Sequence, residues 1–523
     1  MLRSVSSTSE NPRHGTSIAW AAALSVLLCG GSHLAFGRDG LNLREEGYLW
    51  YGVLRVLEGE VPLRDFQGYD PGRYYWCAAF TWLFGQGILG VRAAATAFQA
   101  LGFFFGSLAL ARLSKSRMTL LVSAVIVFLW MFPRFKLFEH SIALGAVWMG
   151  ARYLEAPGRK CAFCSGAFVG LAAFFGRNHG VYLALAFSAL LLFEGWKTRS
   201  PGLFRRLLAL AAGVLVGYAP AWGMLLFVPG YADAVLQAVS LDLAHGANTP
   251  EPYPWFWRVP HGGLDLFELA VQLALDAAFL LPVILFPLGI LVALRTRSDQ
   301  LAARALPIAA TTVGLLYVHH YAVRSDLPHF AQASPPLWLL ALGIPALLPG
   351  MRRLGTWFVL GLLLIPSLLV TGRGTLFSAD PQFPLVHEKV EYPVAGEPLW
   401  LFLPKARQLH LLKRAVDYHV AAEEEDLFIV PASPTLYPFL GKRSPTWWIL
   451  FIWHATAAEQ AATIRQLEER EVKWILLCLQ DYDHDPAYRF ELTNPDVLRY
   501  IAEHFVEVGK PVPPTDYRLL RRR

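Results

Sequence analysis

The chain has 523 residues, of which 55% are hydrophobic and only 16% are charged. Soluble proteins carry about a quarter charged residues, so this composition excludes an ordinary soluble globular protein. The formal net charge is +6, but the basic residues form short clusters between apolar runs. That placement excludes the continuous basic and aromatic surface on which a nucleic-acid-binding protein depends.

The apolar residues gather into runs of roughly 15–25 residues, the length that crosses a bilayer as a helix. The first run, Ser17–Phe36, is too long for the core of a signal peptide and predicts a retained membrane anchor. Further runs bring the prediction to about eleven spans and a mainly α, polytopic membrane protein. They cover residues 88–111, 118–132, 137–151, 161–176, 179–195, 207–228, 267–294, 305–322, 330–350 and 354–371.

The distribution of Lys and Arg predicts how these spans are oriented. With a cytoplasmic N-terminus, every loop expected on the inner side is basic and almost free of acids, as in Lys197–Arg206 and Arg295–Arg304. The loops expected on the outer side hold acids and bases together. Clustered polar residues in those outer loops are therefore the candidates for a functional site.

The first outer loop, residues 37–87, contains two adjacent acids, Glu45 and Glu46. They begin a predicted helix whose apolar residues recur at helical spacing, which is typical of a helix that lies along a membrane surface. Further on, "GYDPGRYYW" adds Asp70, Arg73 and Tyr74 before a second amphipathic segment. Two interpretations stay open: the acids only complement the helix dipole, or they belong to a functional site rich in Arg and Tyr.

Two short outer turns carry further charges. The stretch "PRFKLFEHS" places Arg134 and Lys136 between two spans, and the favoured interpretation is that long basic side chains anchor the turn at the interface. The stretch "GRNHG" places Arg177 and His179 in a tight turn, where a cation facing the first outer loop could hold an anionic lipid headgroup. Packing and binding explain this second turn equally well.

A fourth cluster, in "YVHHYAVRSDLPHF", brings together Arg324, Asp326 and His329. Histidines near a carboxylate invite a metal site, but no pair of His at i, i+4 accompanies a Glu ligand on a helix. No metal and no cofactor are therefore predicted, and a divalent ion has no support in the sequence. Phosphate binding with acid–base chemistry, or packing at the membrane interface, are the remaining interpretations.

Hydropathy falls after residue 370, so the chain divides into a transmembrane domain, 1–372, and a C-terminal domain, 373–523. "DLFIVPA" and "VKWILLCLQ" predict short buried strands. "AAEQAATIRQLEERE" predicts an amphipathic helix, and "NPDVLRYIAEHF" predicts another with Asn494 as N-cap and Pro495 at the first helical position. Alternating strands and helices predict a small α/β domain.

The pattern "REEGYLWYGVLRVLEGEVPLRDFQGYDPGRYYW" resembles the first outer loop of the GT-C superfamily of glycosyltransferases, in particular relatives of bacterial protein mannosyltransferases and aminoarabinose transferases. "RSDLPH" and the ending "LTNPDVLRYIAEHFVEVG" are also similar to this group. The family pattern usually has an Asp-Glu pair, whereas Glu45 holds the first position here. The extra methylene moves the carboxylate by about an ångström, a displacement that matters in catalysis.

The resemblance implies a donor sugar linked to polyprenyl phosphate, a hydroxyl acceptor on a glycan, lipid or protein, and inverting transfer at the outer face of the membrane. It implies Glu45 as general base and Glu46 as its positioning partner, and repulsion between two adjacent carboxylates is expected to raise one pKa. The residues expected to contact the lipid phosphate or sugar are Asp70, Arg73, Tyr74, Arg177, His179, Arg324, Asp326 and His329.

The resemblance also implies a bacterial inner (plasma) membrane, with the N-terminus cytoplasmic and the C-terminal domain periplasmic or extracellular. Two alternatives stay open. A transporter or flippase of lipid-linked sugars would place ionisable residues at mid-membrane, where Glu268 and Asp276 are the ones to follow. A non-catalytic assembly protein of the same fold would tolerate Glu45 in place of Asp.

Overall fold

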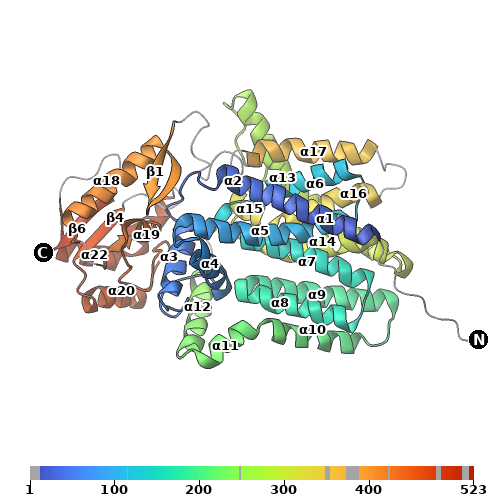
Figure 1. Ribbon diagram of the computed structural model, residues 1–523, viewed down its shortest axis with the longest axis horizontal. Helices are drawn as coiled ribbons and strands as arrows, with labels where there is room; N and C mark the ends of the chain where they lie inside the picture. Colours follow the sequence, from blue (N-terminus) through green and yellow to red (C-terminus); the bar gives the residue numbers. More distant parts are fainter. Residues whose placement is uncertain are drawn as a thin grey trace, which may run out of the picture.

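The structure is a computed structural model that describes residues 12–114, 116–246, 249–347, 354–372, 388–421, 425–478, 485–508 and 517–523. A bundle of long, roughly aligned helices forms one part of the molecule, and a smaller part containing all the strands covers one end of the bundle (Figure 1). The first described helix begins towards the end of the bundle that lies away from the strands (Figure 1).

The helical part alternates long apolar helices with shorter ones. Its helices are α1 (Pro12–Ser25), α2 (Gly31–Phe36), α3 (Glu45–Leu57), α4 (Pro71–Phe84), α5 (Ile88–Leu110), α6 (Arg117–Leu129), α7 (Leu137–Glu155), α8 (Arg159–Phe175), α9 (Arg177–Thr198), α10 (Leu203–Gly217), α11 (Ala219–Phe227), α12 (Tyr231–His245), α13 (Leu266–Arg295), α14 (Ala305–Ala322), α15 (Leu327–Ala333), α16 (Pro335–Leu347) and α17 (Leu354–Gly372). A π-helical turn, η1 (Val26–Gly30), joins α1 to α2, and a 3-10 turn, η2 (Arg134–Lys136), precedes α7.

Among the described residues, four helices are long and apolar enough to cross a membrane: Ser17–Phe36, α5, α9 and α13. Two bent pairs, α6 with the segment Arg134–Glu155 and α10 with α11, raise the number to six if each pair counts as one span. The chain is thus an integral membrane protein. Helices occupy all the apolar runs in which spans were predicted, but the predicted number of about eleven is not confirmed, because several of these helices are short.

Helices α8 and α10 approach each other closely along their backbones. A Cβ atom built on Gly213 of α10 would lie 2.1 Å from the carbonyl oxygen of Phe163, and one on Gly170 of α8 would lie 2.2 Å from that of Val214. Small residues at this spacing allow two membrane helices to pack backbone against backbone. The glycines are therefore required by the packing of this pair.

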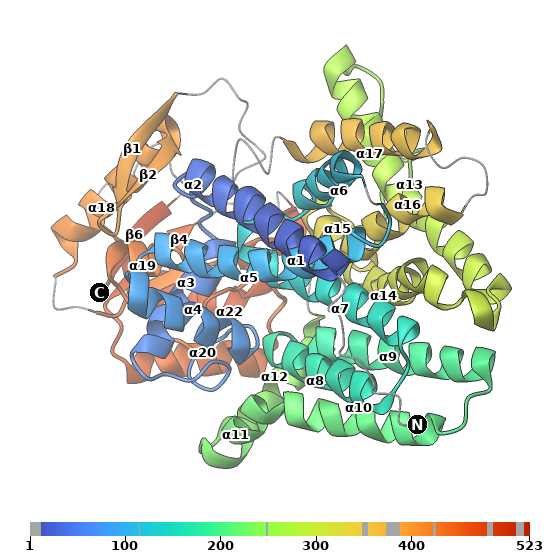
Figure 2. The same cartoon turned by 45° about the vertical axis from the view of Figure 1, so that its right-hand side comes forward.

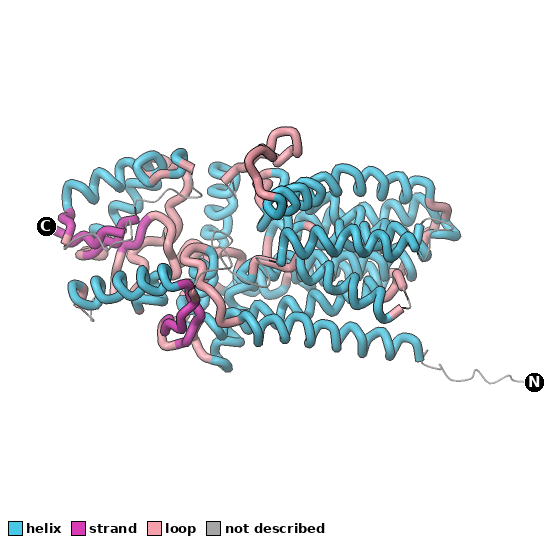
Figure 3. The backbone as a smooth tube through the Cα atoms, turned by 90° about the horizontal axis from the view of Figure 1, so that it is seen from above, coloured by secondary structure: helices cyan, strands magenta, loops and turns pink. Residues whose placement is uncertain are grey.

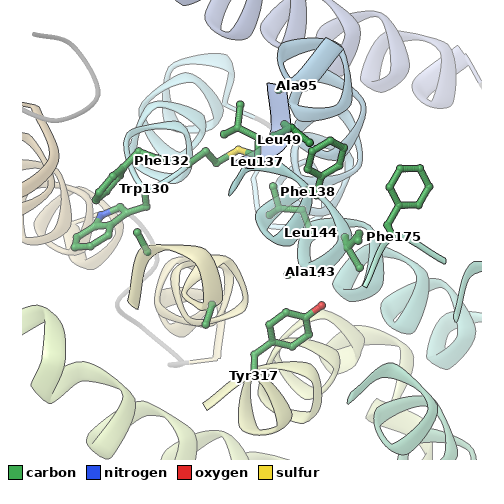
Figure 4. Packing of buried hydrophobic residues seen from close by; sticks show 14 of the residues in the cluster. Leu49, Ala95, Trp130, Phe132, Leu137, Phe138, Ala143, Leu144, Phe175 and Tyr317 are labelled. Carbon is green, nitrogen blue, oxygen red and sulfur yellow. The ribbon is translucent and has the colours of Figure 1, made fainter. Parts of the chain in front are cut away.

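Buried aromatic side chains, among them Trp130, Phe138 and Phe175, pack between the helices (Figure 4). Trp130 stacks on Trp338 with ring centroids 4.5 Å apart, and its Nε1 donates to Ser367 Oγ at 2.8 Å. Phe138 and Phe175 stack at 5.9 Å. Since these side chains come from α7, α8, α16 and α17 and from the end of α6, the core fixes the helix ends that face the C-terminal part.

The C-terminal part contains two sheets, and its strands gather at the end away from the N-terminus (Figure 3). β1 and β2 form an antiparallel hairpin, and the second sheet has the order β3-β4-β6-β5, in which only β3 and β4 run parallel. The elements are β1 (Lys389–Val394), β2 (Glu397–Phe402), α18 (Leu403–His419), β3 (Phe428–Val430), α19 (Leu436–Leu440), α20 (Ala457–Glu469), β4 (Trp474–Cys478), α21 (Phe490–Thr493), α22 (Pro495–His504), β5 (Phe505–Glu507) and β6 (Tyr517–Arg522).

The predicted small C-terminal sheet domain is confirmed, with β3 and β4 on the two predicted strands and α20 and α22 on the two predicted helices. Asn494 stands at the N-cap of α22, but its side chain makes no capping hydrogen bond and Nδ2 donates to Thr493 Oγ1 instead. The predicted domain boundary between residues 372 and 373 lies at the edge of 373–387, outside the described residues.

Helix α3 lies between the bundle and the C-terminal part (Figure 2). The hydroxyl of Thr435 donates to the carbonyl of Asn42 at 2.7 Å, and a Cβ on Gly47 would collide with the Thr435 backbone at 2.0 Å. Most of α3 is buried. The expectation that this helix lies along the membrane surface is therefore corrected: its apolar face packs on protein, because α19 covers it.

Candidate functional site

A cavity of about 1180 Å³ lies where the first outer loop, the bundle and the C-terminal part meet. Eight of the ten residues predicted for the site line it, and Tyr74 and His179 do not. The eight are Glu45, Glu46, Asp70, Arg73, Arg177, Arg324, Asp326 and His329. These eight residues come from three of the four sequence clusters, which the structure brings together from distant parts of the chain.

The start of α3 is fixed by a reciprocal pair of hydrogen bonds. Asn42 Oδ1 accepts from the backbone N–H groups of Arg44 and Glu45, both at 2.9 Å, and the Asn42 N–H donates to Glu46 Oε2 at 3.0 Å. This arrangement satisfies N–H groups that a helix start leaves unpaired. It also sets the direction in which the two acids leave the helix.

Glu46 is buried and forms a bidentate ion pair with Arg92 of α5. Arg92 Nε and a terminal nitrogen each donate to the carboxylate at 2.8 Å, and the same guanidinium donates to the carbonyls of Gly37 and Gly40. Burial alone would raise the pKa of Glu46, but the charges of Arg92 and Arg134 outweigh burial and hold it below the usual value. Repulsion from Glu45 therefore does not raise the pKa of Glu46, contrary to the expectation. The ion pair with Arg92 instead holds the first outer loop against α5.

Glu45 has a different environment from its neighbour, with 29% of its side chain exposed. The hydroxyl of Tyr69 donates to Glu45 Oε2 at 3.2 Å, and Lys136 Nζ lies 3.8 Å from the same oxygen. Lys136 also donates to the Tyr69 hydroxyl at 2.7 Å. Glu45 is thus a partly accessible carboxylate on the cavity wall, held at one oxygen by a phenol and a cation.

Arg73 lines the cavity but is locked in place. Its NH1 group donates to Glu139 Oε1 at 2.7 Å, its Nε donates to the carbonyl of Phe175 at 2.7 Å, and its guanidinium lies 4.7 Å from the Tyr69 ring centroid. The side chain is 5% exposed. Because Glu139 neutralises it, Arg73 stabilises the wall behind Tyr69, and the prediction that it contacts a lipid phosphate has no support in this geometry.

Arg177 is flanked by two acids. Its Nε lies 2.9 Å from Asp70 Oδ1, its backbone N–H donates to Asp70 Oδ2 at 2.9 Å, and NH2 lies 3.1 Å from Asp242 Oδ2. Burial raises the pKa of Asp70 even though Arg177 opposes the rise. The cation that was predicted to hold an anionic headgroup is therefore already matched by carboxylates from α12 and from the turn before α4.

Arg324 is matched in the same way. Its Nε lies 2.6 Å from Asp326 Oδ2 and its NH2 lies 3.1 Å from Glu251 Oε1. Asp326 caps the start of α15, because its Oδ1 accepts a hydrogen bond from the backbone N–H of His329 at 2.7 Å. The same oxygen lies 2.6 Å from His329 Nδ1. Burial alone would raise the pKa of Asp326, but His329 and Arg324 together lower it to about 2.

Tyr74 and His179 do not line the cavity, and their contact with a substrate stays a prediction. The Tyr74 hydroxyl accepts from the Tyr69 N–H at 2.9 Å and donates to the carbonyl of Tyr48 at 3.3 Å. His179 Nδ1 lies 3.0 Å from the Tyr317 hydroxyl, and the two rings stack. Both side chains are fully buried because they fill the packing between helices.

Sequence reasoning treated Arg134 and Lys136 as membrane anchors, but both line the cavity. Arg134 donates to the carbonyls of Phe36 and Asp39 at 2.7 and 2.5 Å. In the described part of the chain, no carboxylate lies within ion-pair distance of Arg134. The signal that could have found these residues is a Pro-initiated turn with two cations at the outer end of a span.

The remaining walls of the cavity differ in character. Apolar side chains from η1, α6, the turn after α6 and α17 line part of it, among them Cys29, Phe128, Met131 and Val370. Tryptophans of the C-terminal part line another. Within the described ranges, no group of three or more His, Cys, Asp or Glu side chains is arranged to hold a metal ion.

The fold is similar to that of ArnT from Cupriavidus metallidurans. The apo structure matches with a TM-score of 0.51 and 13% identity, and the structure bound to undecaprenyl phosphate matches with a TM-score of 0.52 and 13% identity; each match covers 98% of both chains. An Archaeoglobus fulgidus oligosaccharyltransferase complex matches with a TM-score of 0.43, 11% identity and coverage of 89% of this chain and 68% of the other, and it supports no argument here. No family model matches the sequence, and no curated protein matches it significantly. The likeness to ArnT confirms, for the fold, the resemblance to aminoarabinose transferases.

Proposed function

We propose that this chain is a membrane glycosyltransferase that moves a sugar from a polyprenyl-phosphate-linked donor to an acceptor hydroxyl. The proposal depends on one cavity that contains three features together. A partly accessible carboxylate, Glu45, lies beside the cations Lys136 and Arg134, and apolar side chains line another part of the same cavity. A lipid-linked sugar phosphate needs these three features: a base, cations and an apolar channel. The likeness to a protein with bound undecaprenyl phosphate supports the same donor class.

The donor is oriented by the character of the cavity walls. We place its hydrocarbon chain at the end lined by Cys29, Phe128 and Met131, and its phosphate beside Lys136 and Arg134. Arg177 and Arg324 are less suited to hold the phosphate because acids already neutralise them. A dianionic or monoanionic phosphate gains most where positive charge is not yet compensated.

The reaction then follows from the positions of Glu45 and Lys136. The acceptor oxygen attacks the anomeric carbon from the face opposite the phosphate, the C–O bond to phosphate breaks with inversion, and polyprenyl phosphate leaves with the bonding electron pair. Glu45 takes the acceptor proton, which is general-base catalysis. Lys136 and Arg134 stabilise the charge that grows on the leaving phosphate, and Glu46 positions α3 through Arg92.

The two acids that would suggest a transporter have local partners. Glu268 forms a capping box with Asp265 at the start of α13, and Asp276 lies 2.6 Å from His261 Nε2. Nothing in these contacts favours a path for substrate through the middle of the bundle. We also propose that the cavity end of the molecule faces the periplasm or exterior of a bacterial inner membrane, as the basic inner loops predict.

The test uses the full chain, purified in detergent or lipid nanodiscs, and a radiolabelled polyprenyl-phosphate sugar. With cell-envelope membranes as the source of acceptor, release of polyprenyl phosphate is measured for the wild type, for Glu45→Gln and for the control Glu58→Gln, which changes an acid at the far end of α3 outside the cavity lining. We expect Glu45→Gln to lose turnover by roughly 10²–10⁴-fold while Glu58→Gln retains it. Equal turnover by wild type and Glu45→Gln would remove Glu45 as the base.

A further inference from the structure

Three tryptophans of the C-terminal part, Trp447, Trp448 and Trp453, line the cavity. The rings of Trp447 and Trp448 meet edge to face at 4.9 Å, and those of Trp448 and Trp453 lie 6.2 Å apart. All three are partly exposed, whereas the intervening residues are buried. The three rings therefore form one continuous aromatic surface, called here the tryptophan wall, on the side of the cavity contributed by the C-terminal part.

The first outer loop holds the tryptophan wall rigidly. Trp447 Nε1 donates to the carbonyl of Leu63 at 2.9 Å, and the Trp447 carbonyl accepts from the Gln67 N–H at 2.8 Å. Gln67 Oε1 also accepts from the N–H groups of Ile449 and Leu450, both at 3.0 Å. The loop that carries Glu45 thus fixes the aromatic surface, so the wall and the base keep a constant relative position.

Polar groups accompany the rings. In the described part of the chain, Trp453 Nε1 is buried from solvent without a hydrogen-bond partner. Trp448 and Trp453 also line a small adjoining pocket with His245 and Glu459, whose side chains lie 2.8 Å apart. A buried indole N–H without a partner is costly, and an acceptor group on a ligand would satisfy it.

We infer that the tryptophan wall binds a saccharide portion of the acceptor, so that the acceptor is a glycan or a glycan-bearing molecule. This inference rests on the proposed glycosyltransferase function and specifies its acceptor. Pyranose rings present C–H faces that pack on indole faces and hydroxyl rims that exchange hydrogen bonds with groups such as Trp453 Nε1, Glu459 and His245. A hydrocarbon chain would leave the Trp453 N–H without a partner.

The position of the tryptophan wall supports contact with the acceptor rather than with the donor. The cavity end lined by η1, α6 and α17 has the apolar lining suited to the donor chain, whereas the tryptophans come from the C-terminal part. Acceptor and donor would then meet at Glu45 from different walls. A peptide acceptor is the alternative that the test must separate, because tryptophans also pack on apolar side chains.

The test follows the sugar label from a polyprenyl-phosphate donor into cell-envelope membranes, which serve as the acceptor source. Three variants are compared with wild type: Trp448→Ala removes a ring, Trp453→Phe removes mainly the N–H, and Trp257→Ala is a control at an exposed tryptophan outside the cavity. The initial rate is measured against the amount of membrane and, separately, against donor concentration. The labelled product is digested with protease and analysed for sugar composition.

We expect the label on a protease-resistant product that contains sugars other than the transferred one. We also expect Trp448→Ala to raise the half-saturating amount of acceptor by about tenfold, Trp453→Phe to raise it less, and neither to change the half-saturating donor concentration. Label in a protease-digested protein, or in a lipid whose only sugar is the transferred one, would overturn the inference. So would equal acceptor dependence of Trp448→Ala and Trp257→Ala. If donor turnover by the wild type is absent, the proposed function fails first, and the Glu45→Gln experiment reports that failure separately.

Discussion

Two groups of cations face the same cavity with different partners. Arg177 and Arg324, at one side, each lie within ion-pair distance of two carboxylates. Arg134 and Lys136, at the other, contact backbone carbonyls and the Tyr69 hydroxyl, with Glu45 the only carboxylate within 4 Å of Lys136 among the described ion pairs. A cation that is paired with two carboxylates mainly stabilises the fold. A cation with fewer carboxylate neighbours attracts an incoming phosphate more strongly.

The two acids at the start of α3 repeat the same contrast at a smaller scale. Glu46 is 4% exposed at its side chain and bound on both oxygens by Arg92, whereas Glu45 is 29% exposed and held mainly at one oxygen. Adjacent positions on a helix point about 100° apart, so one acid reaches α5 and the other faces the cavity. The pair therefore divides into a structural acid and an accessible one.

The largest effect is expected from breaking the structural pair. Glu46→Ala leaves Arg92 buried without its carboxylate, a change that costs about 3–5 kcal/mol of folding free energy. We expect low yield or a large drop in the thermal unfolding temperature. The control is Asp417→Ala, which removes an exposed i, i+4 pair with Lys413 and should change stability by less than about 1 kcal/mol. Equal stability of the two variants would contradict the assignment of Glu46 as a clamp.

The next effect separates the two groups of cations. Lys136→Met should raise the half-saturating donor concentration by about 10–100-fold, since a charged hydrogen bond to phosphate contributes about 1.5–3 kcal/mol. Arg324→Lys, at a cation with two acid partners, should have a smaller effect on the donor. Steady-state kinetics with a polyprenyl-phosphate sugar measures both, and a reversed order would show that the neutralised side binds the phosphate.

The pH dependence of stability tests Asp326, one of the two carboxylates that neutralise Arg324. The folded pKa of Asp326 is about 2, below the value of about 3.9 for an unfolded Asp, so its stabilising contribution is complete above about pH 4 and is lost as the pH falls towards 2. Between pH 5 and 7 we expect the unfolding temperature of the wild type to exceed that of Asp326→Asn by a constant difference. As the pH falls towards 2, we expect this difference to shrink. A difference that disappears near pH 6 would contradict the low pKa.

The smallest effect is expected from removing one of the carboxylates that neutralise Arg177. Asp242 is 52% exposed and supplies one of the two carboxylates at Arg177. Asp242→Asn leaves Arg177 less compensated, so we expect affinity for polyprenyl phosphate to rise by no more than a few-fold, in keeping with the small energies of exposed ion pairs. Binding can be followed by isothermal titration. A large loss of affinity would indicate instead that Asp242 is needed to hold the site.

The sequence predicted the acid pair and the small C-terminal sheet domain, because charge placement, hydropathy and strand patterns are local signals. It did not predict the role of Lys136, since a cation at a span end looks the same whether it anchors the turn or faces a cavity. Nor could it show that Asp242, 65 positions after Arg177, neutralises that cation. The tryptophan wall was missed because its rings join the cavity through tertiary contacts with the distant Leu63 and Gln67.

The most direct test is an experimental structure of the full chain with polyprenyl phosphate bound. Lys136, with one carboxylate neighbour, and Arg134, with none among the described residues, predict the phosphate within hydrogen-bond distance of Lys136 Nζ and beside Arg134, with Glu45 facing the space next to it and the hydrocarbon chain along α6. A phosphate bound between Arg177 and Arg324, with Lys136 still donating to the Tyr69 hydroxyl, would contradict the account.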